Sequence, residues 1–402
     1  MNYKYYLGSV ILNAILFGYT AAAQAPGNIN SGPTVTGFVF EDINHNGIKD
    51  NNEPGIKGVV VSDQVAVTAT LEDGDYRLTR TKGNRIIFIS LPDSYQITGS
   101  FWQPVDETKE EEVCNFPLIK SKTVSSFTFI HASDTHISPA SIDRMKKLEM
   151  VTDSLKPDLM LITGDLIKDA LRVPEHEATS LYDLFKIEKT KLNTTTWCVP
   201  GNHEIFGIER HLSLVSTNNP LYGIKMYHLY LGPDYYSFNY GGVHFIGLNS
   251  VSFEDLWYYG NIDPVQLDWL KKDIAFVAPQ TPVITFQHIP FYSGGLSLLP
   301  FEDSGPSRTI EQEKGVMQYR HIVSNAQAVM AVLSTHNYPL ALAGHYHYQQ
   351  KFSLAGVQTR FEQTAAVVEA ASNGIFKMPS GIMIYSVKNG RIDEGKFILF
   401  DK

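Results

Sequence analysis

The feature that most constrains the fold of this sequence is an alternation of strand-like and helical runs. It begins at about residue 120. Within 142–155, apolar residues recur at the helical spacing of Met145, Leu148, Val151 and Leu155. Strand-like runs are expected at 127–132, 159–163, 197–199, 283–287 and 340–343, with a hairpin over 235–249 and further helices over 181–187 and 265–276. Alternation of this kind predicts an α/β domain.

A cluster of polar residues directly follows five of these strand-like runs. The clusters are Ser133-Asp134-Thr135-His136, Gly164-Asp165, Gly201-Asn202-His203-Glu204, Gln287-His288 and Gly344-His345-Tyr346-His347. Open α/β sheets place their active sites on loops at the carboxyl ends of strands. Carboxylates, imidazoles and an amide oxygen suit Mn, Fe, Zn or Mg as ligands. The sequence therefore predicts a metal centre on these loops.

The order of the clusters, D-x-H, G-D, G-N-H-[ED], a single His and G-H-x-H, resembles the calcineurin-like metallophosphoesterase family from about Phe127 to the mid-300s. The resemblance implies a four-layer αββα sandwich over residues 123–402, including a C-terminal β segment. It also implies two divalent metal ions that share Asp165. One ion would be bound by Asp134, His136, Asp165 and His347, and the other by Asp165, Asn202, His288 and His345.

This resemblance implies a hydrolase of small phosphate esters, monoesters or diesters, that uses a hydroxide bridging the two ions. His203, which has no metal assigned, would donate a proton to the leaving oxygen. Segments 204–211, 253–260 and 291–320 are expected to form long loops along the cleft, where Arg308 and Arg320 could grip a second phosphate or a carboxylate. Structural roles are predicted for His45, His131, His176, His211, His228, His244, His321 and His336.

Residues 34–119 have a different character. Short β-branched or aromatic runs separated by turns predict a small β-sandwich domain. Within it, residues 42–53 match a calcium-binding loop, with a strand-like run before it in place of a helix. The predicted calcium ligands are Asp42, Asn44, Asn46, Ile48 through its carbonyl, Asp50 and Glu53. The segment resembles the calcium loop of B-type repeats in bacterial surface adhesins, and a metal-free Asn/Asp-rich turn is the alternative.

The first 23 residues have the features of a secretory signal peptide. Lys4 precedes an apolar run over 7–17, and small residues at 21–23 follow in an Ala-x-Ala pattern. The apolar run is too short to span a membrane, so we expect a periplasmic or extracellular protein with no membrane span after cleavage. Export permits a disulfide, but Cys114 and Cys198 lie in unrelated contexts and are not expected to pair.

The formal net charge of −9 bears on the partners of the chain. An acidic chain lacks the basic surface that nucleic-acid binding needs, although bound metal ions would still attract a small phosphorylated substrate. The sequence leaves the substrate, the native metals and the oligomeric state open. The alternative function is a calcium-dependent surface adhesion or scaffold protein with an inactive phosphoesterase domain, and the complete ligand set argues against it.

Overall fold

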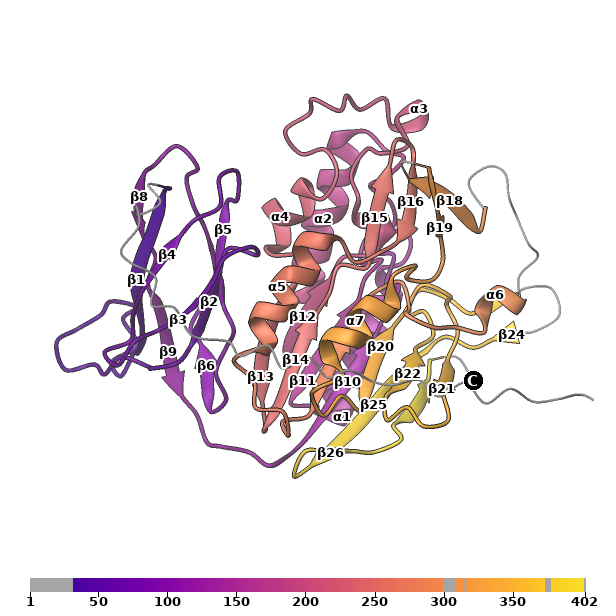
Figure 1. Cartoon of the computed structure of the whole chain (residues 1–402). Coiled ribbons are helices and arrows are strands. Elements are labelled where there is room, and N and C mark those ends of the chain that lie inside the picture. Colours follow the sequence, from indigo (N-terminus) through magenta and orange to yellow (C-terminus); the bar gives the residue numbers. More distant parts are fainter. Residues whose placement is uncertain (1–31, 299–307, 314, 373–376, 401–402) are drawn as a thin grey trace, which may run out of the picture. The chain divides into compact units, whose positions relative to one another are not determined.

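The computed structural model describes residues 32–298, 308–313, 315–372 and 377–400. The predicted signal peptide at 1–23 lies outside the described residues. Gly32–Lys402 form one compact unit. In this unit a strand-rich N-terminal region is followed by a larger α/β region (Figure 1).

Two sheets, one mixed and one antiparallel, make up the N-terminal region. One has the strand order β4-β1-β9-β6, with β8 paired to β1, and the other has the order β3-β2-β5-β7. Their inward-facing residues, such as Val39 and Ile87, are buried in one apolar core. The strands are β1 (Thr34–Glu41), β2 (Val60–Ser62), β3 (Val67–Ala69), β4 (Asp75–Thr79), β5 (Ile86–Ile89), β6 (Tyr95–Ile97), β7 (Trp102–Pro104), β8 (Glu111–Val113) and β9 (Phe116–Lys120).

The α/β region is built on two mixed sheets, each with six strands among the described residues. The first has the order β12-β11-β10-β25-β26, with β27 on β25, and the second has the order β13-β14-β17-β20-β22-β21. The first comprises β10 (Ser126–Ala132), β11 (Leu159–Thr163), β12 (Thr195–Val199), β25 (Gly381–Lys388), β26 (Arg391–Ile392) and β27 (Lys396–Leu399). The second comprises β13 (Tyr236–Tyr240), β14 (Val243–Gly247), β17 (Val283–Phe286), β20 (Leu340–Ala343), β21 (Gln350–Ser353) and β22 (Arg360–Gln363).

Successive side chains of β11 point into different layers of the fold. Leu159 and Leu161 belong to the core that the first sheet shares with the second, whereas Met160 and Ile162 belong to the core beneath α1 and α2. The helices α5 and α7 cover the other face of the second sheet (Figure 1). The predicted four-layer αββα arrangement is therefore confirmed. The longer helices are α1 (Ile142–Leu155), α2 (Glu175–Lys189), α4 (Lys225–Leu231), α5 (Pro264–Ile274) and α7 (Ala326–Leu333).

The three wall segments that were expected to be long loops contain short regular elements among their described residues, and the expectation is wrong for 253–260, which forms a hairpin. The first, 204–211, holds the end of a 3₁₀ turn, η1 (Asn202–Glu204), and the start of α3 (Arg210–Ser213). The second forms a hairpin of β15 (Val251–Glu254) and β16 (Trp257–Gly260). The third contains α6 (Gly295–Leu298) and a hairpin of β18 (Ile310–Glu313) and β19 (Val316–Tyr319). A short pair, β23 (Ala371–Ser372) and β24 (Lys377–Met378), lies near the C-terminus.

The N-terminal region covers the edge strand β13 of the second sheet. The backbone N–H of Asn239 donates to the carbonyl of Leu91 over 2.8 Å. A neighbouring strand would make the same kind of hydrogen bond. The carboxylate of Asp93 accepts the N–H groups of Gly241 and Gly242 at the turn that follows, over 3.1 and 2.8 Å. Because an uncovered edge strand invites pairing with other chains, this contact protects the sheet.

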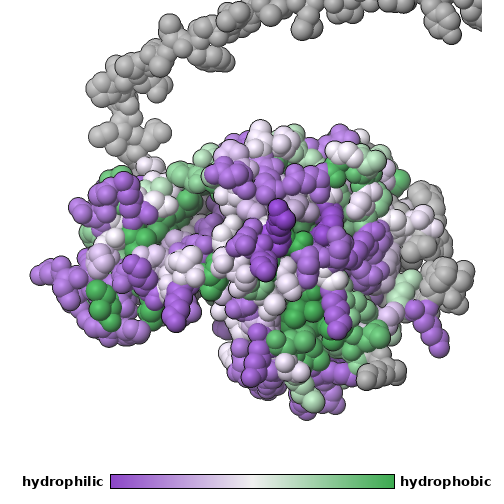
Figure 2. Space-filling view, turned by 90° about the horizontal axis from the view of Figure 1, so that it is seen from below, coloured by the Kyte–Doolittle hydropathy of each residue, from purple (hydrophilic) through white to green (hydrophobic). Residues whose placement is uncertain are grey.

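The surface of the face in Figure 2 is mainly hydrophilic, with smaller hydrophobic areas among the polar residues. Within the described ranges, none of the helices is both long enough and apolar enough to cross a membrane.

Candidate metal centre

The seven predicted metal ligands lie together, on loops that follow strands of both sheets. Asp134 and His136 follow β10, Asp165 follows β11, Asn202 follows β12, His288 follows β17, and His345 and His347 follow β20. Ligand atoms of Asp134, His136, Asp165 and His347 lie within 4.8 Å of one another, as do those of Asp165, His288 and His345. Asp165 is common to the two groups, as in the arrangement that the family resemblance implies.

Asn202 belongs to the second group by its contacts. Its Oδ1 lies 3.2 Å from Nε2 of His288, and that nitrogen lies 3.2 Å from Oδ2 of Asp165. The amide oxygen therefore faces the same small space as the imidazole and the carboxylate.

The donor atoms fit divalent cations. Oδ1 of Asp134 is buried and makes no hydrogen bond within the part of the chain that the structure describes, and Nε2 of His347 lies 3.3 Å from it. The Nε2 atoms of His136 and His347 face each other at 3.2 Å, and Nδ1 of His345 lies 3.1 Å from Nε2 of His288. Buried lone pairs that converge in this way need a cation or protons between them. Mixed oxygen and nitrogen donors favour a borderline divalent metal ion in that position.

The backbone at these positions is strained. Five of the seven candidate ligands have a positive φ: Asp134 (53°), His136 (37°), Asp165 (48°), His345 (75°) and His347 (60°). Such conformations cost about 1–3 kcal/mol each for non-glycine residues and cluster at functional sites. Hydrogen bonds between the loops hold them, for example from the N–H of Asp134 to the carbonyl of Gly164 over 3.0 Å.

Two glycines allow the loops to approach each other closely. A Cβ atom at Gly201 would lie 2.2 Å from Oδ1 of Asp165, and one at Gly344 would lie 1.8 Å from Oγ of Ser133. A side chain at either position would therefore push apart the loops that bring the ligands together.

Burial and charge act in opposition on the central groups. Burial would raise the pKa of Asp165, but the nearby imidazoles of His288 and His203 hold it well below its usual range. Burial would lower the pKa of His288, but Asp165 and Asp134 raise it to about 9. The pKa of His136 falls to about 4 because burial dominates. Cations compete with protons for these atoms, so we expect metal binding to weaken at acidic pH.

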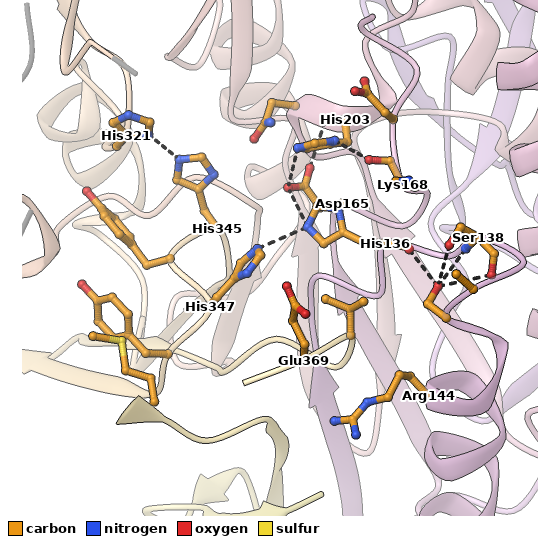
Figure 3. Close-up of a pocket in the computed structure, with 18 of the residues that line it drawn as sticks. His136, Ser138, Arg144, Asp165, Lys168, His203, His321, His345, His347 and Glu369 are labelled. Carbon is orange, nitrogen blue, oxygen red and sulfur yellow. Dashed lines mark hydrogen bonds and ion pairs between the residues drawn. The ribbon is translucent and has the colours of Figure 1, made fainter. Parts of the chain in front are cut away.

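His203, the predicted proton donor, lies beside the cluster. Its Nδ1 lies 2.6 Å from the carbonyl oxygen of Lys168, which can only accept, so this nitrogen carries a proton. Its ring meets that of His136 edge to face at 4.6 Å, and its Nε2 lies 3.9 Å from Oδ2 of Asp165 (Figure 3). Nε2 is therefore the nitrogen that faces the centre.

Glu204 has a role for which the sequence alone gave no assignment. Its carboxylate accepts the N–H groups of Leu166, Ile167 and Gly201 over 2.8, 3.0 and 2.6 Å, and so ties the loop after β11 to the loop after β12. Burial and the charge of Asp165 raise its pKa to about 8, against the effect of these hydrogen bonds. Its place at the end of the Gly-Asn-His-Glu cluster was the available signal.

Of the histidines assigned structural roles, His321 lies at the site and His131 behind it. His321 lines the cavity, with its Nδ1 2.8 Å from Nε2 of His345. His131 is fully buried, with its Nε2 2.9 Å from Oγ1 of Thr163, and burial lowers its pKa to about 3. His321 therefore lies at the cavity, where the sequence predicted only a structural residue, whereas His131 is a core residue.

The guanidinium groups of the two arginines that were expected to grip an anion lie over aromatic rings. The guanidinium of Arg308 lies 4.5 Å from the ring centre of Trp257, and that of Arg320 lies 4.1 Å from the ring centre of Tyr258. Arg320 is only 1% exposed. The sequence did not reveal the β15–β16 hairpin that supplies these rings, and the anion-binding role of the two arginines stays a prediction.

A cavity of about 890 Å³ opens over the centre. Figure 3 shows His321 and His345 on one side, and Ser138, Lys168 and Arg144 on the other. Its lining comprises His136, Ser138, Ala140, Ser141, Arg144, Asp165, Lys168, Asp169, Asn202, His203, Tyr258, His321, His345, Tyr346, His347, Tyr348, Val368, Glu369 and Met378.

Both cysteines are described by the structure. Cys114 and Cys198 are buried and free, so the expectation that they do not pair is confirmed.

Parts of this chain are similar to known proteins. A probable cyclic nucleotide phosphodiesterase of Rhodococcus erythropolis is 23% identical over 242 residues, which cover 57% of this chain and 67% of the relative. A dimetal phosphatase from Danio rerio is 15% identical, with a TM-score of 0.46 and coverage of 68% of this chain and 99% of that one. GAP50 of Plasmodium, the anchor in the inner membrane complex, is 14% identical, with a TM-score of 0.42 and coverage of 69% and 86%.

Two family models together match most of the described chain. Residues 43–121 match the model of the N-terminal domain of calcineurin-like phosphoesterases. Residues 127–349, more than half of the chain, match the model of the calcineurin-like phosphoesterase domain itself. With its clustered ligands and its four-layer fold, this chain belongs to the calcineurin-like phosphoesterase family.

Proposed function

We propose that the protein hydrolyses small phosphodiesters with the help of two divalent cations. The observation that carries the proposal is the convergence of seven oxygen and nitrogen donors into two groups that share Asp165, with His203 beside them. When bound, the cations would supply Lewis-acid stabilisation of the phosphate and a water molecule of lowered pKa.

The residues of the chain divide the remaining work. His203 holds a proton on Nδ1 against the carbonyl of Lys168, which leaves Nε2 to give a proton to the leaving oxygen when the ring is charged. Glu204 fixes the loops that carry Asp165 and His203.

The name of one relative supports a diester over a monoester, and the cavity is large enough for either. The cavity of about 890 Å³ falls in the range of about 300–1,000 Å³ typical of sites for small organic ligands, so an organic group can enter with the phosphate. The relative in Rhodococcus erythropolis is named as a probable cyclic nucleotide phosphodiesterase. The alternative of an inert scaffold is disfavoured because all seven donors are present and converge.

The test is hydrolysis by metal-stripped protein reconstituted with Mn²⁺, Zn²⁺, Mg²⁺ or Fe²⁺. We expect bis-(p-nitrophenyl) phosphate to be cleaved faster than p-nitrophenyl phosphate, and Asp165→Ala to cleave neither. The reverse preference would replace the diester with a monoester. Absence of metal binding and of hydrolysis in the wild type would contradict the enzyme function.

We also propose that the protein is exported. The proposal rests on Lys4, the apolar run over 7–17 and the small residues before Gln24. Expression of the full chain in a bacterial host, followed by N-terminal sequencing of the periplasmic and secreted fractions, tests it. Cleavage after Ala23 is expected, and an intact N-terminus in the cytoplasm would contradict export.

A third proposal is that residues 42–53 bind calcium. The carboxylate of Asp42, which is 1% exposed, accepts the N–H groups of Asn46 and Gly47 over 3.1 and 3.0 Å. The amides of Asn44 and Asn46 donate to Asp50 over 2.7 and 3.0 Å. A bound cation would instead face the oxygens of these side chains, so binding would turn both amides around.

Calcium is expected to raise the melting temperature of calcium-free wild-type protein by mass action. The same shift should persist in Asp165→Ala, which keeps the loop, and disappear in Asp42→Ala. A wild-type melting temperature that does not respond to calcium would assign the loop to a metal-free turn.

A further inference from the structure

His321 lies next to one candidate ligand, outside the two groups of donors. It follows strand β19, and its Nδ1 lies 2.8 Å from Nε2 of His345 (Figure 3). The two rings stack, with their centres 5.1 Å apart and their planes at 27°. This geometry allows a hydrogen bond between the imidazoles.

The direction of that hydrogen bond follows from the other nitrogen of His345. Its Nδ1 lies 3.1 Å from Nε2 of His288 and so faces the donor cluster. An imidazole that binds a cation through Nδ1 keeps its proton on Nε2. That proton then points at Nδ1 of His321, which accepts it.

The neighbouring ligand His288 has the same kind of support from a different group. Its Nδ1 lies 2.8 Å from the carbonyl oxygen of Thr163, which accepts a proton and leaves Nε2 for the cluster. Partners of this kind fix the tautomer and the ring orientation of ligating histidines. At His345 the side chain of His321 takes the place of the carbonyl.

The segment that carries His321 is held firmly. The N–H of Val323 donates to the carbonyl of Pro290, and the N–H of Ser324 donates to the carbonyl of Gly260, both over 2.8 Å. A Cβ atom at Gly260 would lie only 2.2 Å from the carbonyl oxygen of Ile322, so glycine lets the two backbones meet. A fixed backbone can hold His321 at one distance from His345.

We propose that His321 is a positioning residue that fixes the tautomer and ring angle of His345. It thereby strengthens cation binding by the group formed by Asp165, Asn202, His288 and His345, and leaves the other group unaffected. This inference rests on the proposed metal centre.

The experiment compares His321→Leu, which fills a similar volume without an acceptor, with His321→Asn, whose Oδ1 can take the place of Nδ1. Metal-stripped proteins are titrated with Mn²⁺ by calorimetry, and the bound ions are counted by electron paramagnetic resonance. In His321→Leu, one of the two equivalents should bind about 10- to 100-fold more weakly. His321→Asn should recover most of that loss, and His211→Ala, an exposed control, should bind like the wild type.

Wild-type binding of both equivalents by His321→Leu, or equal losses in the Leu and Asn variants, would overturn the inference. Thermal melting of the metal-free proteins detects a folding defect, and the comparison of Leu with Asn still decides the question if both are destabilised alike. Failure of the wild type to bind any Mn²⁺ would instead refute the proposed metal centre.

Discussion

Asn202 and His203 are neighbours in the chain, yet their side chains serve different partners. The amide oxygen of Asn202 lies inside the donor cluster, 3.2 Å from Nε2 of His288. The Nδ1 of His203 is held by the carbonyl of Lys168, outside the cluster. Two adjacent residues therefore supply two different positions, one suited to binding a cation and one suited to donating a proton.

The variant His203→Asn tests the second of these roles. Loss of a proton donor should lower kcat by about 10²- to 10⁴-fold for alkyl phosphate esters, which have poor leaving groups. The loss should be smaller for nitrophenyl esters because nitrophenolate needs little protonation. Metal content should stay at the wild-type value, since His203 is in neither donor group.

Steady-state kinetics with both ester types and elemental analysis of the purified variant provide the measurements. A missing metal ion in His203→Asn, or equal losses with both ester types, would show that His203 has another role.

Asp165 is shared by the two donor groups, so its removal should affect both cation positions. Asp165→Ala is expected to lose both bound ions and all measurable hydrolysis, whereas Asp183→Ala, on the exposed face of α2, should keep both. Elemental analysis after purification in excess Mn²⁺ measures the content. Retention of one full equivalent in Asp165→Ala would mean that the carboxylate does not bridge.

The candidate ligands could be found from the sequence, but two of their supporting residues could not. Asp134 and Asp165 each follow an apolar strand directly, so local pattern and position agree. His321 follows no such motif, and its contact with His345 depends on where the β18–β19 hairpin lies in space. Glu204 sits in a motif, but its three hydrogen bonds appear only when the loops are brought together.

Regular elements were predictable where one face is buried and one is exposed. Helix α1 has the predicted bounds of Ile142–Leu155 because Met145, Leu148 and Thr152 pack inward at helical spacing. The β15–β16 hairpin was not predictable, because its turn is Asp255-Leu256, without the Gly that usually marks such turns. Asp255 adopts a φ of 51° there, a conformation that aspartate tolerates better than most residues.

A buried carboxylate links strand β13 to the N-terminal region. Asp234, next to β13, accepts hydrogen bonds from His228 (2.7 Å), Gln64 (2.8 Å) and Asn249 (2.7 Å). Burial would raise the pKa of Asp234, but His228 and the hydrogen bonds from all three side chains lower it below its usual value. A carboxyl whose native pKa lies below its unfolded pKa stabilises the fold above the unfolded value, near pH 4.

Asp234→Asn should therefore lower the free energy of unfolding at pH 7 by about 1.5–3 kcal/mol, the range for a hydrogen bond to a charged group. The deficit should shrink as the pH falls below about 4, because the wild type then loses the same contribution. Urea denaturation at pH 7 and pH 3, with Asp183→Asn as the exposed control, measures it. A deficit that does not change with pH would contradict the assigned charge.

The N-terminal region and the α/β region share a single apolar core over the described part of the chain. The ring of Phe101 lies 5.0 Å from that of Trp197 and 4.9 Å from that of Tyr236. The side chain of Trp102 packs against Gly232 so closely that a Cβ there would lie 2.4 Å from the indole. The two regions therefore depend on each other for burial of these aromatic surfaces.

Truncation to residues 123–402 should expose the edge of β13 and the rings of Trp197 and Tyr236. We expect this fragment to aggregate or to melt well below the protein spanning 24–402, as light scattering and calorimetry at equal concentration would show. A monodisperse fragment with an unchanged melting temperature would mean that the shared core contributes little.

The candidate ligands come from both sheets: three of the supporting strands, β10, β11 and β12, lie in the first, and two, β17 and β20, lie in the second. A cation bound between them would act as a removable cross-link between the two halves of the sandwich. At 100 times its dissociation constant, such an ion adds about 2.7 kcal/mol to the stability of the folded state. The supply of metal would then set how long each molecule survives proteolysis, as well as how fast it turns over substrate.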